Sequence, residues 1–309
     1  MTTTAARRIV RAAMLLATLL VTAPTVNAQS IEPRQYVNTP VGVNFVVAGF
    51  ANTEGGVSFD SALPAENPKL TTNSAVVGYA RSLDLWGLSG KIDAAVPYTW
   101  LSGSVNYAGE RLERSVSGFG DPVVRLSVNL YGAPALAAQE FHSYRQDLIV
   151  GAALQVSVPV GQYDDTRLVN IGTNRWWFKP SIGVSKALDP WILETGVAVT
   201  LYTDNDDYYG GHTRSQDPLY SLEWHVIRSF GKGIWASLDG NFYTGGSTTI
   251  DGVAKHDLQR NWRVGGTLAL PVDRRNSIKL YASNGVSART GNDYALYGIA
   301  WQYRWGAGF

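Results

Sequence analysis

The chain has 309 residues, with 26 basic and 25 acidic side chains and a formal charge of +1 at pH 7, so it lacks the strong basic field that nucleic-acid binding requires. It contains no cysteine, which excludes a disulfide framework and argues against thiolate metal sites and a cysteine nucleophile. Charged residues make up only 17% of the chain, below the roughly 25% of ordinary soluble domains, and glycine and tryptophan are abundant, which favours an all-β protein.

The N-terminus has the three regions of a cleaved secretory signal. Three arginines precede an apolar run at 12–23, and the small residue Ala28 precedes Gln29 at the expected cleavage site. That run is too short for a transmembrane helix, which needs about 20 residues. We therefore expect residues 1–28 to be removed, leaving 23 basic and 25 acidic residues and a formal charge of −2. Residues 29–40 are expected to form a periplasmic lead-in to a barrel at 41–309.

Alternation of apolar with smaller or polar residues, the pattern of a strand with one apolar face, recurs along the rest of the chain. In the clearest stretch, 148–160, Leu148, Val150 and Leu154 share one face. An even number of strands of about ten residues suits a bacterial outer-membrane barrel with both termini in the periplasm. The sequence predicts about twelve strands, near 41–51, 73–82, 87–100, 121–131, 146–160, 175–187, 191–202, 218–229, 233–244, 258–271, 277–286 and 294–305.

The predicted connections alternate in length, as in bacterial barrels with short periplasmic turns and long outer loops. Two connections depart from this pattern, because 131–145 is long for a turn and 287–293 is short for an outer loop. The number of strands is therefore predicted only to within one hairpin. The short connections lie at 82–86, 188–190, 230–232 and 272–276, and the long ones at 52–72, 101–120, 161–174, 203–217 and 245–257.

Aromatic residues near the ends of the predicted strands are expected to form girdles at the membrane surface. They include Trp86, Trp100, Trp176, Tyr202, Trp235 and Phe242. The alternative is a secreted β-sandwich, whose strands also alternate because one sheet face packs on a core. The girdles, the loop lengths and the last strand favour the single antiparallel transmembrane β-barrel.

The last strand is strongly patterned up to the final residue. Trp301, Tyr303, Trp305 and Phe309 alternate with polar or small residues and are expected to face lipid, with Gln302 and Arg304 inward. Such an aromatic terminal strand resembles that of outer-membrane barrels, so the barrel-insertion machinery is an expected partner.

Three stretches of sequence carry recognisable motifs. They are Glu32-Pro33-Arg34 with Pro40 to Phe45 and Gly49; Gly118-Phe119-Gly120-Asp121-Pro122; and Pro159 to Tyr163 with Asn170-Ile171-Gly172, Asn174-Arg175-Trp176 and Pro180. They resemble the family named for the meta-cleavage pathway of phenol degradation. The resemblance implies an outer-membrane barrel that acts as a transporter, often associated with aromatic or other hydrophobic compounds. It supplies neither a substrate nor binding residues. The motifs also have a plain structural interpretation as Gly- and Pro-rich punctuation at strand ends.

If the apolar face meets lipid, the opposite face lines the lumen and carries charges of both signs. Charged residues facing lipid would cost roughly 2–4 kcal/mol each near the midplane, which supports this register. These charges could pair with one another or form an anion-favouring constriction. The candidates are Lys91, Asp93, Arg125, Lys179, Glu194, Glu223, His225, Asp239, Arg263, Lys279 and Arg304.

Enzymatic activity is not expected. A serine hydrolase needs a serine, a histidine and an orienting group in contact, and no GxSxG segment accompanies the four histidines, His142, His212, His225 and His256. The acidic loop stretches 164–165 and 204–207 are interpreted as solvated, because the twelve-residue calcium-loop pattern is missing. We expect no catalytic residues, no metal and no cofactor.

The sequence thus predicts a Gram-negative outer-membrane channel for passive uptake of small solutes, with aromatic or hydrophobic compounds as candidate substrates. The expected partners are the lipid bilayer, lipopolysaccharide and a small-molecule solute, and no nucleic acid. The alternative function is a structural or surface-interaction barrel with an occluded lumen.

Overall fold

The computed structural model describes residues 32–56, 66–107, 110–287 and 293–307. The predicted signal at 1–28, its cleavage site at Ala28 and Gln29, and the final Phe309 lie outside these residues. Within the described part, no helix has the length and apolar character needed to cross a membrane.

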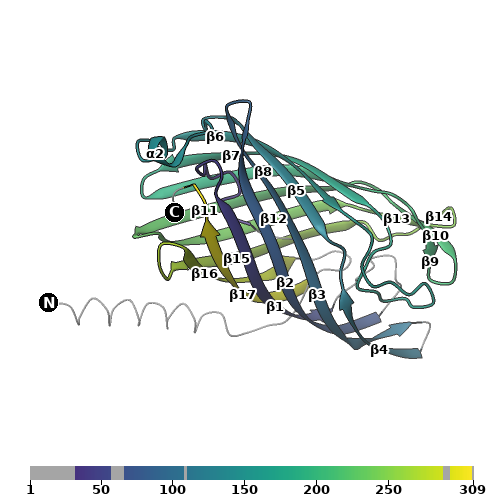
Figure 1. The fold of residues 1–309 in the computed structure, drawn as a ribbon. Coiled ribbons are helices and arrows are strands. Elements are labelled where there is room, and N and C mark those ends of the chain that lie inside the picture. Colours follow the sequence, from purple (N-terminus) through teal and green to yellow (C-terminus); the bar gives the residue numbers. More distant parts are fainter. Residues whose placement is uncertain (1–31, 57–65, 108–109, 288–292, 308–309) are drawn as a thin grey trace, which may run out of the picture.

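One large antiparallel sheet closes on itself to form a barrel (Figure 1). Adjacent strands of the sheet pair antiparallel, and β1 pairs with β17 as well as with β2, which closes the ring. The strands of the sheet are β1 (Asn44–Gly56), β2 (Glu66–Leu85), β3 (Leu88–Tyr107), β4 (Glu110–Phe119), β5 (Val123–Tyr131), β6 (Leu148–Ser157), β7 (Trp177–Leu188), β8 (Trp191–Tyr202), β11 (Leu219–Gly231), β12 (Ile234–Gly245), β15 (Gln259–Pro271), β16 (Asn276–Ser287) and β17 (Asp293–Trp305).

The 13 strands of this sheet form a twelve-stranded wall, because β4 and β5 share one position. Both pair with β3, β4 along residues 98–107 and β5 along residues 90–95. The all-β fold and the predicted strand number are therefore confirmed, with one strand interrupted at residues 120–122.

The interruption falls in the Gly118 to Pro122 motif, where the side chain of Asp121 binds the β6–β7 loop. The Asp121 carboxylate accepts hydrogen bonds from the backbone N–H groups of Gly161 (2.9 Å) and Thr173 (2.8 Å), both in the long β6–β7 loop. Gly120 donates its N–H to the carbonyl of Pro97 (2.9 Å), and a Cβ at Gly120 would lie 2.9 Å from Pro97 Cγ. The two sequence motifs thus meet in space and fix the loop against the broken strand.

Short turns join β2 to β3, β7 to β8, β11 to β12 and β15 to β16 at one end of the barrel, and the long β6–β7 loop lies at the other. The predicted long loop at 101–120 is instead largely strand, in β3 and β4. The 132–147 connection, predicted to be atypical, contains the short helix α2 (Ala138–Phe141) and lies at the short-turn end (Figure 1). At the opposite end, four strands that the sequence did not predict form a separate small sheet. These are β9 (Asn205–Tyr208), β10 (His212–Gln216), β13 (Thr248–Ile250) and β14 (Val253–Ala254).

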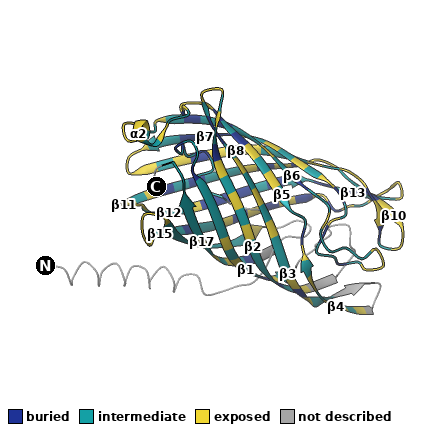
Figure 2. Cartoon of the chain, in the orientation of Figure 1, coloured by how far each residue is buried: buried dark blue, intermediate teal, exposed yellow. Residues whose placement is uncertain are grey.

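Exposed and buried residues alternate along the strands, as Figure 2 shows. In β8 and β12, Leu193 and Leu238 are exposed on the outer face, whereas Glu194 and Asp239 are buried on the inner face. The outer surface is therefore apolar and the interior polar, the reverse of a soluble protein and the pattern of a membrane barrel.

Candidate functional site in the barrel interior

The predicted inward-facing charged residues all lie on the face opposite the exposed apolar side chains. Glu194, His225, Asp239 and Arg263 are fully buried, at 4%, 5%, 1% and 0% exposure, and the other predicted residues are partly buried.

Opposite charges pair along the inner wall. Arg125 Nε lies 3.0 Å from Asp93 Oδ1 on the neighbouring strand, and Lys179 Nζ lies 3.1 Å from Glu223 Oε1. Buried charges need such partners, since leaving one unpaired costs about 3–5 kcal/mol. The wall is thus held by local charge pairs, one of the two arrangements that the sequence left open.

Glu194, His225 and Asp239 form a cluster at paired positions on three adjacent strands, β8, β11 and β12. His225 Nδ1 lies 2.8 Å from Asp239 Oδ1, and the Ser237 hydroxyl donates to Asp239 Oδ2 (3.0 Å). Glu194 accepts a hydrogen bond from the Ser185 hydroxyl (2.9 Å). Because Ser237 donates to the acid and not to the imidazole, this cluster does not have the geometry that activates a serine nucleophile.

The remaining predicted cations have different surroundings. Arg263 Nη2 donates to the Ser283 hydroxyl (2.7 Å), and Lys279 Nζ lies 6.0 Å from the centroid of the Trp235 ring. Arg304 donates from Nε to the carbonyl of Arg274 (2.8 Å) in the β15–β16 turn. It therefore stabilises the short-turn end of the barrel and does not take part in the charge pairs at its centre.

The lead-in segment, residues 32–43, occupies the interior of the barrel. Residues 29–40 were predicted to form a periplasmic lead-in, but the described part of that range lies among inward-facing side chains. Glu32 Oε2 accepts a hydrogen bond from Arg125 Nη1 (2.7 Å), and the backbone N–H of Arg34 donates to Glu194 Oε2 (2.7 Å). The interior charges attract this segment because it brings a carboxylate and a guanidinium of its own.

The lead-in reaches across the barrel from one wall to another. Glu32 contacts Arg125 on β5, whereas the Arg34 guanidinium lies over the Trp235 ring on β12, 5.4 Å from its centroid. At the short-turn end, the Ser82 hydroxyl donates to the carbonyl of Pro40 (2.5 Å), and the N–H of Val41 donates to the carbonyl of Leu136 (2.9 Å). The segment is thus anchored at the rim and at the centre.

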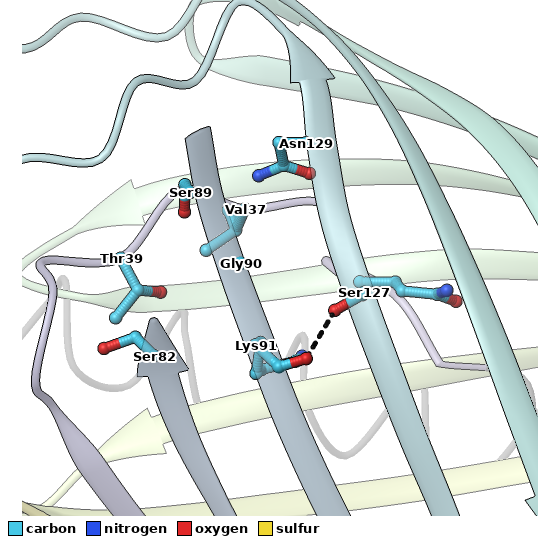
Figure 3. Close-up of a pocket in the computed structure, with 9 residues that line it drawn as sticks. Val37, Thr39, Ser82, Ser89, Gly90, Lys91, Ser127 and Asn129 are labelled. Atoms are coloured by element: carbon cyan, nitrogen blue, oxygen red, sulfur yellow. Dashed lines mark hydrogen bonds between the residues drawn. The ribbon is translucent and has the colours of Figure 1, made fainter. Parts of the chain in front are cut away.

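A small cavity separates the lead-in from β2, β3 and β5. Figure 3 shows Val37 and Thr39 of the lead-in facing Ser82, Lys91 and Asn129 around it. Its volume of about 20 Å³ is enough for one water molecule. The lead-in therefore fits the wall on this side closely, through polar groups.

The long β6–β7 loop covers part of the inner face at the other end. Val169 of this loop packs against Leu70 on β2 and Leu101 on β3, and its carbonyl accepts a hydrogen bond from Arg114 Nε (3.2 Å). Together, the loop and the lead-in narrow the interior from both ends.

Two residues predicted to belong to the membrane girdles point inward instead. Trp235 is 7% exposed and lies beneath Arg34, and the Tyr202 ring stacks under the Arg175 guanidinium at 4.5 Å. Aromatic rings also bind cations through their faces, and these two rings contact guanidinium groups in the interior instead of the membrane surface. Their positions in the alternation were the available signal, since both share the face of buried polar residues.

Trp301, Tyr303 and Trp305 lie on the outer face of β17. The rings of Trp301 and Tyr303 stack at 6.1 Å, those of Tyr303 and Trp305 at 5.7 Å, and Tyr79 of β2 lies 6.2 Å from Trp305. Gln302 and Arg304 alternate with them on the inner face. The result is an aromatic band on the outer surface near the short-turn end.

The residues that sequence analysis missed are Glu32, Arg34 and Tyr36 of the lead-in and the glycines beneath Tyr36. Glu32 and Arg34 stood in a family motif but were interpreted as preceding the barrel. Their charges, opposite to those of Arg125 and Glu194 on the inner wall, were the one signal that could have revealed them.

Comparison with known proteins agrees with this fold. The structure is similar to that of the COG4313 outer membrane channel from Pseudomonas putida F1, with a TM-score of 0.77 and 20% sequence identity over 89% of this chain and 100% of the other. It is more distantly similar to the beta domain of the Bordetella autotransporter BrkA, with a TM-score of 0.50 and 11% identity over 85% of this chain and 99% of the other. No curated protein matches the sequence significantly. Residues 45–303 match a protein family described as "Putative MetA-pathway of phenol degradation", and the chain belongs to that family.

Proposed function

We propose that the protein is an outer-membrane channel through which small solutes diffuse passively, with aromatic compounds among its substrates. The observation that carries this proposal is a closed barrel whose charged interior is filled by a segment that belongs to no strand of the wall. Such a segment can leave without breaking the sheet, because its contacts with the centre are side-chain hydrogen bonds and ion pairs. The similar Pseudomonas structure, described as a channel, and the family's pathway name both support the proposal.

The interior determines which solutes pass. We propose that Arg125, Lys91 and Lys279 line the narrowest part, because all three attract the carboxylate of Glu32 electrostatically and Arg125 contacts it. When Glu32 leaves, these cations face the lumen and favour the entry of anions or of polar groups that accept hydrogen bonds. Solute moves down its gradient, and the protein supplies no catalytic step.

Conductance in planar lipid bilayers tests this function. The mature chain, beginning at Gln29, is compared with a variant that lacks residues 29–38. If the protein is a channel, we expect rare, small openings for the mature chain and steady conductance for the truncated variant. Absence of conductance from both, together with no swelling of liposomes in any small solute, would refute it.

The alternative is a surface-interaction barrel whose lumen stays closed. The extra sheet of β9, β10, β13 and β14 beyond the long-loop end is the observation in its favour. In that case the outer loops, with lipopolysaccharide as the neighbouring partner, carry the activity. The truncated variant distinguishes the two functions, because an interaction barrel does not need an interior that opens.

The location is tested separately. We propose removal of residues 1–28 on export and insertion through the aromatic last strand, including Phe309. N-terminal sequencing of the protein from outer-membrane fractions should begin at Gln29, and unboiled samples should migrate differently from boiled samples on gels. Recovery from the soluble periplasm would contradict this location.

A further inference from the structure

The side chain of Tyr36 lies in a flat slot on the inner wall of the barrel. Its floor is a row of three glycines, one from each of three adjacent strands. Gly151 of β6 pairs directly with Gly183 of β7, which pairs directly with Gly196 of β8. Glycine inside a strand often marks a place where another group approaches the backbone closely.

The ring lies along this row and touches all three positions. A Cβ added at Gly183 would lie 2.4 Å from Tyr36 Oη and 2.5 Å from Cε2, and one added at Gly151 would lie 2.4 Å from Cδ1. At Gly196 the distance to Oη would be 3.3 Å. The slot is therefore as long as a phenol ring and is open only because all three side chains are missing.

The two ends of the slot differ in chemistry. At the Cβ end, Tyr36 packs against Ile149 and Ala133, which are buried and apolar. At the hydroxyl end, Ser181 is its hydrogen-bonding neighbour, and the carboxylates of Glu223 and Glu194 lie nearby. Burial raises the pKa of Tyr36 to about 12, and the two carboxylates add to this rise, so the slot holds a neutral phenol.

We propose that this slot is a binding site for neutral, para-substituted phenols, and that Tyr36 occupies it as a tethered competitor. The tyrosine side chain is itself 4-methylphenol attached to the backbone, so the fit of the natural occupant defines the ligand. The backbone beside it contacts the wall through Asn129, whose Nδ2 donates to the Tyr36 carbonyl at 3.3 Å. This inference rests on the proposed function only in that solute must enter the lumen to reach the slot.

The site discriminates by charge and by hydrogen bonding. A benzoate would bring a negative charge toward Glu223 and Glu194, and toluene would leave Ser181 without the hydroxyl that it contacts. Both compounds should bind more weakly than 4-methylphenol, by at least about tenfold, because one hydrogen bond to a buried group is enough for such a difference.

The test uses the full mature chain in detergent, with Tyr36→Ala to empty the slot while Glu32 and Arg34 keep their contacts. Calorimetric titration should show saturable binding of 4-methylphenol to this variant and at least about tenfold weaker binding to the wild type, where Tyr36 competes. Toluene and 4-methylbenzoate are the comparison ligands. If Tyr36→Ala fails to give a heat-modifiable barrel, Tyr36→Ser carries the same expectation.

Two variants in the Tyr36→Ala background locate the binding. Gly183→Ala fills the centre of the floor and should abolish binding of 4-methylphenol. Gly49→Ala is the matched control, because Gly49 is an inward-facing strand glycine on β1 whose added Cβ would meet nothing closer than 3.5 Å. Binding should survive that change.

The proposal is overturned if Tyr36→Ala does not bind 4-methylphenol, if toluene binds equally well, or if Gly183→Ala leaves binding unchanged. Bilayer conductance of the same variants reports the channel function independently. Conductance without phenol binding would refute the slot alone, whereas binding without conductance would support the slot and refute the channel.

Discussion

Replacing Glu32 by glutamine removes the charge that holds the start of the described lead-in at the centre of the barrel. Glu32 Oε2 lies 2.7 Å from Arg125 Nη1, with the carboxylate side chain 37% and the guanidinium 13% exposed. A hydrogen bond between buried charged groups contributes about 1.5–3 kcal/mol, and an exposed ion pair contributes about 0.2–1 kcal/mol. For this half-buried contact we expect a loss of about 1–2 kcal/mol, which shifts the lead-in toward its undocked state about 5- to 30-fold.

Single-channel recording in planar bilayers measures this shift as open probability. Glu32→Gln should raise it about 5- to 30-fold over the wild type, within the limits of full opening. The matched control is Glu140→Gln in α2, because Glu140 makes only a local contact with the backbone N–H of Ala137 at 3.0 Å. Adding Glu32→Gln to Arg125→Gln should have little further effect, since the partner is already gone. An open probability equal to that of the control would refute the idea that this ion pair keeps the lumen occupied.

Three further changes test other parts of the reasoning. The Arg125 guanidinium, followed by the Lys91 and Lys279 ammonium groups, holds the pKa of Glu32 well below its usual value of 4.5, so its contribution is present above that value and is lost only as the pH falls through the depressed pKa. Open probability should therefore stay constant from about pH 8 to 5 and rise only at much lower pH; a rise near pH 5–6 would contradict the assignment. Leu126→Arg, at a position 47% exposed on the outer face of β5, should make the free energy of folding into lipid vesicles less favourable by roughly 2–4 kcal/mol, whereas Trp86→Arg in the β2–β3 turn should leave it unchanged. Equal free energies of folding for the two variants would mean that the outer face does not meet hydrocarbon. Arg125→Gln and Arg263→Gln should each shift reversal potentials toward cation preference, and a residue whose replacement leaves the potential unchanged does not line the narrow part of the path.

The barrel wall could be predicted from the sequence because the face on which a strand residue lies depends only on its position along that strand. Side chains of a strand point to alternate faces, so the run from Leu148 to Val156 assigns both an outer and an inner face without knowledge of any neighbour. Short turns and long loops then order the strands around the ring. The same local argument placed Glu194 and Asp239 on the inner face, where the structure has them buried.

Interactions between distant segments could not be predicted in this way. Residues 32–43 have no period, so nothing local distinguishes a segment inside the lumen from one outside it. The small sheet of β9, β10, β13 and β14 is built from loop residues whose pairing partners, such as Arg214 and Ile250, lie in different loops. Trp235 was assigned to a girdle by its position near a strand end, although its place in the alternation indicated the interior.

The glycine row depends both on the face of the strand to which each glycine belongs and on the register in which the strands pair. Alternation assigns Gly151, Gly183 and Gly196 separately to the inner face, but only the pairing of β6 with β7 and β7 with β8 aligns them into one floor. A shift of one residue in either pairing would point the glycines of one strand to the other face and close the slot. The register is fixed over the whole length of these strands by their apolar outer face. The same outer face that meets lipid therefore also determines where the interior can hold a ring, and this links the membrane fold to the selectivity that we propose.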